Sequence, residues 1–496
     1  MIYKGFCTYC SLCCSVNLWE NEVYELKLDS SEKLHLCPRG LHQIELSNHR
    51  KRLVFPWVKG EEVSWQEAEA HLSDPGSETA VISPDISLED ALSIRKRFKE
   101  VYIYGARADF EMLEGVVCSK VLKSIDEVGE VDAIFLFGDV FSLAPPIARR
   151  ILERKYKNRV FVYSLDFYLS RTASFASRRW VVKPEEFLLF LYLILETLGK
   201  KIAKVKVPEG VEDLRKKAES FAAAIEASWT PLFVFSSMDG AVPDPYLLSS
   251  LICMLSGIFR SSEFYYILQG GNTFGFYLRQ DFFQPYTGKV KGPIVVFGDV
   301  EVEGAAMAFG YFKNKAEIQI PIATPLESGG TFEPLPGVEL KMEGAPAADG
   351  TKKIREIFQD QIEGGRKREY PSSFDVNKFA ERFNKYLDWL NEMKQTPGLT
   401  VVEEILPVLP DRSKIRENLD YFSSYPMEGV AKLNPSEIET SRKTLIFSNG
   451  VRLKIKPDKK VEPGVVVIPR PFARELGLLE MKDGLYYCKK QEVKYE

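Results

Sequence analysis

Cysteine placement constrains this chain more than any other feature. Five of its eight cysteines, Cys7, Cys10, Cys13, Cys14 and Cys37, fall within the first 37 residues. We expect a reducing cytoplasmic compartment, because the N-terminal residues show no apolar signal segment. Disulfides are then a poor explanation, since a chain of 496 residues can build a core without covalent cross-links. The crowding therefore indicates a metal centre.

The spacing favours an iron–sulfur cluster over zinc. Cys7 and Cys10, together with Cys13 or Cys14, place three thiolates on one loop, and Cys37 supplies a fourth from a second segment. Zinc sites with four cysteines usually take two Cys-x2-Cys pairs, whereas the second segment here has one thiol. Three ligands on one loop and a distant fourth are typical of a [4Fe–4S] cluster. Spacing alone does not decide between Cys13 and Cys14, because both choices match known cluster patterns.

Beyond the cysteines, strand-like and helical segments alternate along the chain. Apolar runs at residues 80–83, 101–104, 133–137 and 160–163 alternate with helical patterns. This alternation predicts an α/β protein with two doubly wound parallel-sheet domains. A weak repeat supports two such units, since residues 133–140 and 293–300 are both buried-strand patterns that end in Gly-Asp. Each Gly-Asp is either a ligand site at a strand end or a simple turn.

A local pattern between these regions predicts a strand pair and a capped helix. Residues 53–63 read as two short strands with a turn at Lys59 and Gly60. Ser64 followed by Glu67 predicts a capping box at the start of the next helix.

The run Cys7-Thr-Tyr-Cys10-Ser-Leu-Cys13-Cys14, followed by Cys37-Pro-Arg39-Gly40, resembles the N-terminal cluster domain of the molybdopterin oxidoreductase superfamily. The resemblance leaves Cys13 as a spare packing thiol. It places Arg39 between cluster and pterin, although Arg39 could equally be a surface arginine that caps a turn. The cluster ligands that it implies are Cys7, Cys10, Cys14 and Cys37.

Further matches to the superfamily follow in order as far as about residue 360. They include Arg171-Thr172-Ala173, a Gly-Gly-Asn272 segment, and Glu327 followed by Gly-Thr-Phe. The Gly-Thr-Asp that seats the pterin guanosine in the family is replaced by residues 183–186, Lys-Pro-Glu-Glu. Cys118 is the one thiol in the window for a molybdenum ligand, and its surroundings read as a buried helical face. A molybdopterin is therefore not expected.

The positions of the histidines limit where a histidine could act in acid–base catalysis. All four histidines, His35, His42, His49 and His71, lie in the first 71 residues, so histidine acid–base catalysis in either α/β half is excluded. The sequence thus predicts a non-catalytic iron–sulfur electron-transfer subunit of a multisubunit oxidoreductase. It most resembles the C-terminal, pterin-free part of the large iron–sulfur subunit of bacterial NADH-quinone oxidoreductase, respiratory complex I. The alternatives are a catalytic molybdenum or tungsten bis-pterin enzyme of the formate or formylmethanofuran dehydrogenase type, and a zinc-bound scaffold without redox activity.

The predicted organisation has five parts. These are a [4Fe–4S] domain at 1–55, α/β domains at 56–225 and 226–350, a helical and Pro-rich linker region at 351–440, and a small β domain at 441–496.

Charge and hydropathy limit the kinds of partner that can be expected. With 66 basic and 70 acidic residues and no basic arm, the chain is not expected to bind nucleic acid. The longest apolar run, residues 187–195, is far shorter than the roughly 20 residues of a spanning helix. We therefore expect other redox subunits as partners, and contact with the cytoplasmic face of the inner membrane only through them.

Overall fold

The computed structural model describes residues 2–20, 26–28, 36–73, 77–117, 121–238, 241–259, 261–290, 292–300, 302–358, 367–369, 373–404, 429–438, 442–482 and 485–496. The chain divides into two compact units that interleave along the sequence. Of the described residues, unit 1 contains those within 2–110 and 268–369, and unit 2 contains those within 111–267, 373–404 and 429–496. The predicted five-part division stays a prediction.

Unit 1 begins with a small antiparallel sheet, β1 (Ile2–Phe6), β2 (Ser15–Glu20) and β3 (Leu26–Leu28), followed by α1 (Pro38–Asn48). Its main sheet has eight strands in the order β13-β7-β6-β14-β15-β16-β4-β5. The strands from β13 to β16 are parallel, and β4 and β5 are antiparallel. Their bounds are β4 (Trp57–Val58), β5 (Glu61–Glu62), β6 (Thr79–Ile82), β7 (Glu100–Ile103), β13 (Gln284–Pro285), β14 (Ile294–Phe297), β15 (Ala305–Gly310) and β16 (Ile318–Pro321).

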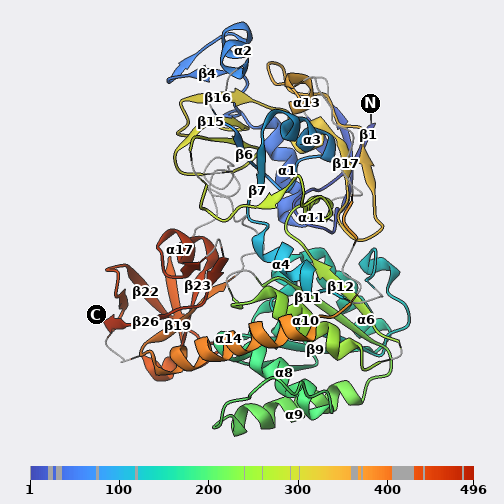
Figure 1. The fold of residues 1–496 in the computed structure, drawn as a ribbon, viewed down its shortest axis with the longest axis vertical. Helices are drawn as coiled ribbons and strands as arrows, with labels where there is room; N and C mark the ends of the chain where they lie inside the picture. Colours follow the sequence, from blue (N-terminus) through green and yellow to red (C-terminus); the bar gives the residue numbers. More distant parts are fainter. Residues whose placement is uncertain are drawn as a thin grey trace. The chain divides into compact units, whose positions relative to one another are not determined.

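The helices of this unit are short, and α1 and α3 are drawn close to β6 and β7 in Figure 1. A two-stranded sheet, β17 (Gly330–Phe332) with β18 (Leu340–Met342), completes the unit. The helices are α2 (Trp65–Ser73), α3 (Leu88–Arg97), α11 (Thr273–Tyr277), α12 (Pro325–Ser328) and α13 (Ile354–Ile357), while α4 (Arg107–Gly115) crosses into unit 2.

Unit 2 contains an all-parallel five-stranded sheet in the order β10-β9-β8-β11-β12. The strands are β8 (Ala133–Phe137), β9 (Phe161–Asp166), β10 (Arg178–Val181), β11 (Pro231–Ser236) and β12 (Glu263–Ile267). The predicted parallel sheets are thus confirmed. Stacked rings cross four of these strands, from Tyr163 through Phe135 and Phe233 to Phe264, with centroids 4.9, 5.4 and 5.5 Å apart. The paired rings lie directly opposite one another in the strand register, and such cross-strand aromatic pairs stabilise a sheet.

The helices of unit 2 include one that is apolar on every side. In α8 (Phe187–Thr197), residues 187–195 are all buried, because the helix packs against both α9 and α10 (Figure 1). Among the described residues, no helix is both long and apolar enough to cross a bilayer. The helices are α5 (Val140–Leu143), α6 (Pro145–Lys157), α7 (Arg171–Phe175), α8, α9 (Glu212–Glu226), α10 (Pro245–Ser256) and α14 (Val376–Gln395), with 3-10 turns at Ile125–Glu127 and Pro184–Glu186.

The C-terminal part of unit 2 is a nearly closed, barrel-like sheet of seven strands in the order β26-β19-β23-β20-β22-β21-β27. Its two edge strands, β26 and β27, are separated in sequence only by Glu492. The sequence places this β structure at 441–496, but the sheet also takes β19 and β20 from the range expected to be a linker. The strands are β19 (Leu399–Glu404), β20 (Val430–Leu433), β21 (Thr444–Phe447), β22 (Arg452–Pro457), β23 (Val465–Pro469), β26 (Lys490–Gln491) and β27 (Val493–Tyr495).

Around this sheet lie α17 (Arg470–Glu475), the pair β24 (Glu480–Lys482) and β25 (Leu485–Tyr487), and a 3-10 turn at Pro435–Glu437.

Two local predictions are confirmed. The strand pair β4–β5 turns at Lys59 and Gly60, which both have positive φ, 51° and 89°. Ser64 and Glu67 form the capping box at the start of α2, because each donates a backbone N–H to the other's side chain.

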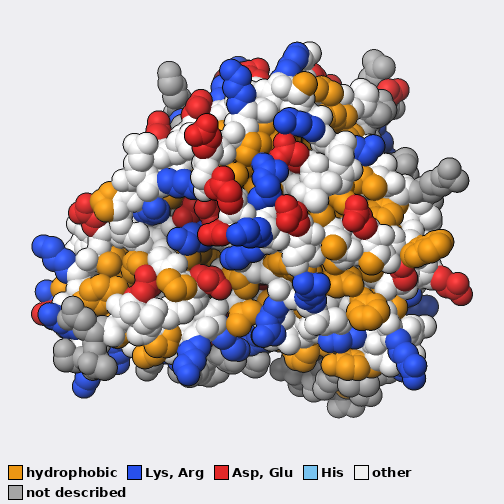
Figure 2. Space-filling model, turned by 90° about the horizontal axis from the view of Figure 1, so that it is seen from below, with side chains coloured by type: hydrophobic (Ala, Val, Ile, Leu, Met, Phe, Trp, Pro, Cys, Tyr) orange, Lys and Arg blue, Asp and Glu red, His pale blue; other side chains and the backbone are white. Residues whose placement is uncertain are grey.

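The surface carries side chains of both charges. On the face drawn in Figure 2, Lys and Arg side chains lie among Asp and Glu in the upper and middle parts, and Lys and Arg predominate in the lower part.

Candidate metal centre

The cysteine-rich loop connects β1 to β2. The ladder between these strands ends at the pair Phe6 and Ser15, and just beyond it the Cys7 N–H donates to the Cys14 carbonyl at 2.8 Å. Inside the loop, the Cys13 N–H donates to the Cys10 carbonyl at 3.2 Å. The hairpin therefore closes the loop at its base, and Cys7, Cys10, Cys13 and Cys14 all lie in this one loop.

The loop is fastened to a second segment that is distant in sequence. The Ser11 N–H donates to the Leu268 carbonyl at 3.0 Å, and the Leu268 N–H donates back to the Ser11 hydroxyl at 3.0 Å. Gly270 and Gly271 donate their N–H groups to the carbonyls of Tyr9 and Thr8, at 2.9 and 2.7 Å. Four hydrogen bonds thus fix the backbone of the loop.

Gly270 and Gly271 are glycines because the chains approach closely here. Gly270 has φ +84°, and a Cβ on it would lie 2.6 Å from the Pro84 Cβ. A Cβ on Gly271 would lie 3.3 Å from the Cys13 sulfur. Pro84 follows the carboxyl end of β6, so the cysteine loop lies near the carboxyl edge of the eight-stranded sheet.

Cys37 approaches the loop at the beginning of α1. It is the N-cap residue of that helix, with Pro38 in the first turn. Gln43, on the same helix, donates its amide to the Thr8 hydroxyl at 2.6 Å and accepts the Thr8 N–H at 3.2 Å. On the same helix, a Cβ on Gly40 would lie 3.4 Å from the Cys7 sulfur. These contacts bring the N-terminus of α1, which favours negative charge, to the thiols.

The electrostatics show which thiols are gathered together. Burial raises the pKa of Cys7 well above its usual range, and the charges of Cys37, Cys10 and Cys14 raise it further. Burial and the charge of Cys37 raise the pKa of Cys10 to about 11. The charges of Cys37, Cys10 and Cys14 therefore act on Cys7, and the charge of Cys37 acts on Cys10, in a poorly solvated volume.

Two backbone N–H groups and one side chain lower the pKa of these thiols and so oppose the effect of burial. The Tyr9 N–H hydrogen-bonds to the Cys7 sulfur and lowers its pKa, and the Leu12 N–H does the same at Cys10. Arg39, in the first turn of α1, also lowers the Cys10 pKa through its charge. Arg39 therefore lies beside the thiols.

Cys13 differs from the other loop cysteines in its packing, although burial and the charges of Cys10 and Cys14 raise its pKa as well. Its backbone has φ +43°, an uncommon conformation for a residue with a side chain. Its sulfur lies 3.6 Å from the Cys10 carbonyl, and the side chain packs in an apolar cluster with Phe6, Val16 and Phe332. This surrounding is that of a packing thiol.

The donor set fits an iron–sulfur cluster. Four thiols converge from two segments, two of them accept backbone N–H bonds, and a cation and a helix N-terminus face them. Within the described ranges, no three Cys, His, Asp or Glu side chains are arranged around a point for a single metal ion. A cubane places each thiolate on its own iron, so its ligands are spread more widely than those of one zinc ion.

Two of the segments that resemble the superfamily, at Asn272 and at Glu327, are buried in unit 1. Asn272 donates its amide to the Ile86 carbonyl at 3.0 Å and accepts the Glu333 N–H at 3.0 Å. Glu327 forms an ion pair with Arg52 at 2.5 Å, and both side chains are at most 3% exposed. The roles of Arg52, Gln43 and Ser11 were not predicted from the sequence, because no local pattern reveals partners that lie 275, 35 and 257 residues away.

The two Gly-Asp repeats end equivalent strands, β8 and β14, each beside the point where strand order reverses in its sheet. In unit 2, Asp139 accepts hydrogen bonds from the Ser142 N–H and from the N–H and hydroxyl of Thr172. Asp166, at the end of the neighbouring β9, accepts from the Ser170 hydroxyl and the Phe167 N–H. These carboxylates are therefore engaged by their own chain.

The same edge of the five-stranded sheet is covered by the C-terminal sheet. The Leu169 N–H donates to the Lys460 carbonyl at 3.0 Å, and the Thr400 hydroxyl donates to Glu185 at 3.1 Å. Glu185 belongs to the segment that replaces Gly-Thr-Asp. Cys118, the candidate molybdenum ligand, lies outside the described residues.

Comparison with known proteins shows the fold but no family. No family model and no curated protein matches the chain. Among solved structures, acetylene hydratase from Pelobacter acetylenicus is similar, with a TM-score of 0.59, 11% identity, and coverage of 95% of this chain and 93% of that one. The chain thus shares that protein's fold over nearly its whole length.

A second solved structure is more distant. The formyltransferase/hydrolase complex from Methylorubrum extorquens, in complex with methylofuran, matches with a TM-score of 0.37 and 15% identity, over 66% of this chain and 99% of that one. This likeness is too weak to carry an argument.

Proposed function

We propose that the protein is an iron–sulfur electron-transfer protein whose [4Fe–4S] cluster is bound by Cys7, Cys10, Cys14 and Cys37. The observation that carries the proposal is geometric: the loop that holds Cys7, Cys10 and Cys14 is closed at its base, and Cys37 caps α1, where a Cβ on Gly40 would lie 3.4 Å from the Cys7 sulfur. The Cys13 side chain packs in an apolar cluster. When bound, such a cluster accepts and releases one electron at a time.

The surrounding residues would set how readily the site takes up negative charge. The N–H groups of Tyr9 and Leu12 and the charge of Arg39 all stabilise negative charge on the sulfurs, as does the N-terminus of α1. The hydrogen bonds from Gly270 and Gly271 hold the loop, and therefore its N–H groups, in place.

On the wider scale we propose a redox subunit of a multisubunit oxidoreductase, similar to the large iron–sulfur subunit of NADH-quinone oxidoreductase and without a pterin. What supports the pterin-free assignment is unit 2, where Asp139 and Asp166 bind their own chain and residues 183–186 lie beneath the C-terminal sheet. Other redox subunits would be its partners and would supply any contact with the cytoplasmic face of the inner membrane.

A catalytic molybdenum or tungsten enzyme is the second candidate. It is favoured by the fold shared with acetylene hydratase along 95% of the chain. It is also favoured by the seven-stranded sheet, which extends from Leu399 to Tyr495 and so is larger than the sequence indicates.

Cysteine substitutions test the electron-transfer proposal. We would prepare Cys14→Ser and Cys13→Ser under anaerobic conditions and measure iron per chain and the electron paramagnetic resonance of the dithionite-reduced protein. Cys14→Ser should lose the wild-type signal and iron, whereas its neighbour Cys13→Ser should keep both. Retention by Cys14→Ser with loss by Cys13→Ser would refute the ligand assignment, and an iron-free wild type would refute the proposed function.

A further inference from the structure

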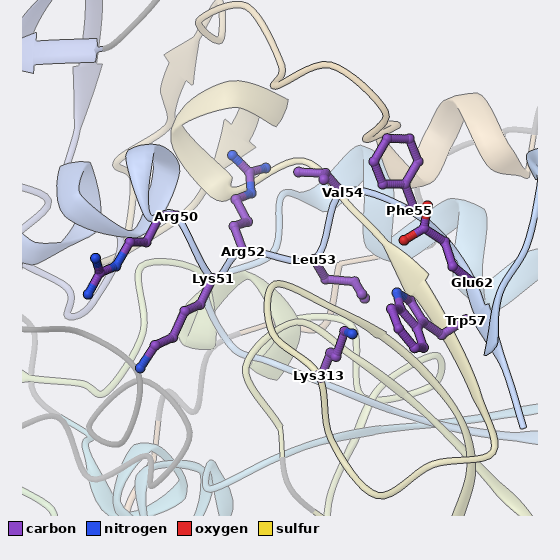
Figure 3. A pocket seen from close by; sticks show the side chains of 9 residues that line it. All are labelled: Arg50, Lys51, Arg52, Leu53, Val54, Phe55, Trp57, Glu62 and Lys313. Carbon is purple, nitrogen blue, oxygen red and sulfur yellow. The ribbon is translucent and has the colours of Figure 1, made fainter. Parts of the chain in front are cut away.

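A cationic cavity of about 480 Å³ lies in unit 1, on the segment that leaves α1 (Figure 3). Three exposed cations line it, namely Arg50, Lys51 and Lys313. Glu62 is the one carboxylate among its lining residues. The fourth cation, Arg52, is committed to the buried ion pair described above. The cavity therefore carries an excess of positive charge that the described part of the protein does not neutralise with an ion pair.

The cavity also has an aromatic side. Phe55 is 49% exposed although it is a large apolar side chain. The Lys313 ammonium lies 2.9 Å from the centre of the Trp57 ring, a cation–π contact at the cavity wall. The Lys313 side chain therefore covers a face of the Trp57 ring, and Phe55 is the exposed aromatic side chain of the cavity.

The two kinds of group occupy different ends of the cavity. In Figure 3, Arg50 and Lys51 extend on one side, Phe55 and Trp57 lie on the other, and Lys313 is next to Trp57. Trp57 is held in place because β4 pairs with both β5 and β16. The volume falls within the roughly 300–1,000 Å³ typical of small-molecule sites.

We propose that this cavity binds a small anion that carries a flat ring, with a mononucleotide as the type of ligand. Arg50 and Lys51 would contact the phosphate, as charged donors do at phosphate sites. Phe55 would provide the stacking surface, as aromatic side chains do for nucleobases, because the Lys313 ammonium already covers a face of the Trp57 ring. Nothing in this proposal depends on the cysteine centre.

Isothermal titration calorimetry on the whole protein tests it with three probes: adenosine 5′-monophosphate, inorganic phosphate and adenosine. We expect the mononucleotide to bind at least tenfold more tightly than either part alone. An adventitious anion site would bind phosphate and the mononucleotide equally, and this outcome would overturn the proposal. An acidic peptide is a further probe: if it binds and the mononucleotide does not, the proposal is overturned in favour of a partner-protein surface.

Variants separate the two ends of the cavity. Substituting both Arg50→Gln and Lys51→Gln should weaken mononucleotide binding about tenfold or more. The matched control, Lys216→Gln with Lys217→Gln, removes the same charge from two adjacent exposed residues on α9 and should change nothing. Equal weakening by both double variants would contradict a defined site.

The aromatic end is tested by Phe55→Leu. Because Phe55 is on the rim and half exposed, this change should leave folding intact. Loss of stacking should weaken the mononucleotide about tenfold and leave phosphate binding unchanged. An unchanged mononucleotide affinity would refute the role of Phe55.

Discussion

The close approach of Gly270 to Pro84 allows the loss of stability in a Gly270→Ala variant to be predicted. Gly270→Ala places a side chain on a residue with φ +84°, which costs about 1–2 kcal/mol for an L-residue in the left-handed region. The new Cβ would also lie 2.6 Å from the Pro84 Cβ and 2.8 Å from its carbonyl oxygen. Relieving that clash requires a backbone shift that costs a further ~1–3 kcal/mol. The expected loss of stability is therefore about 2–5 kcal/mol.

Gly105→Ala is the matched control. Gly105 is also in unit 1 and has φ +69°, but a Cβ there would meet nothing within 4 Å. Gly105→Ala should lose only the stability that the left-handed backbone conformation costs. The difference in free energy of unfolding between the two variants therefore measures the cost of the clash with Pro84. Urea unfolding, followed by tryptophan fluorescence, gives both values, and iron per chain should fall only in Gly270→Ala. Equal midpoints and equal iron for the two variants would refute the described contact between Pro84, Gly270 and the cysteine loop.

Two further predictions concern buried charges. Arg52→Ala removes the partner of Glu327 inside unit 1 and should lower the free energy of unfolding by about 3–5 kcal/mol. Lys99→Ala breaks an ion pair whose side chains are 74% and 69% exposed, and it should lower the free energy of unfolding by less than ~1 kcal/mol. Similar urea midpoints for the two variants would contradict the burial of the first pair. Burial and the charge of Asp139 raise the pKa of Asp166 well above its usual range, so the native chain keeps a proton that the unfolded chain has released, and stability should fall as pH rises from the ordinary carboxyl range towards that raised pKa. Asp166→Asn should flatten this dependence between pH 5 and pH 8, and an unchanged slope would count against a protonated Asp166.

Local patterns in the sequence were enough to predict individual elements. The strands β6 and β8 are buried throughout, and their continuous apolar runs predict parallel strands covered on both faces. Ser64 and Glu67 are three residues apart, so their capping box is visible without any knowledge of the fold.

Long-range pairing was not accessible in the same way. The eight-stranded sheet joins β6 and β7 to β14, although the whole five-stranded sheet lies between them in sequence. The strand β19 was concealed because its Leu399–Glu404 segment stands beside a Pro-rich stretch and finds its partner, β23, only about 60 residues later. Patterns of hydrophobicity describe which face is buried and not which strand covers it.

In the candidate site, too, local features were predictable from the sequence and long-range contacts were not. Spacing identified a group of cysteines but not the orientation of Cys13 relative to Cys14, which depends on the backbone of the loop. That backbone is held by Leu268, Gly270 and Gly271, and the sequence gives no sign that these residues meet the N-terminal loop.

Elemental analysis of anaerobically purified protein tests the central claim most directly. Iron, zinc, molybdenum and tungsten would be measured together with the protein concentration. The account predicts about four irons per chain, as one cubane requires, with neither molybdenum nor tungsten. Stoichiometric molybdenum or tungsten would contradict the pterin-free assignment, and one zinc without iron would contradict the cluster itself.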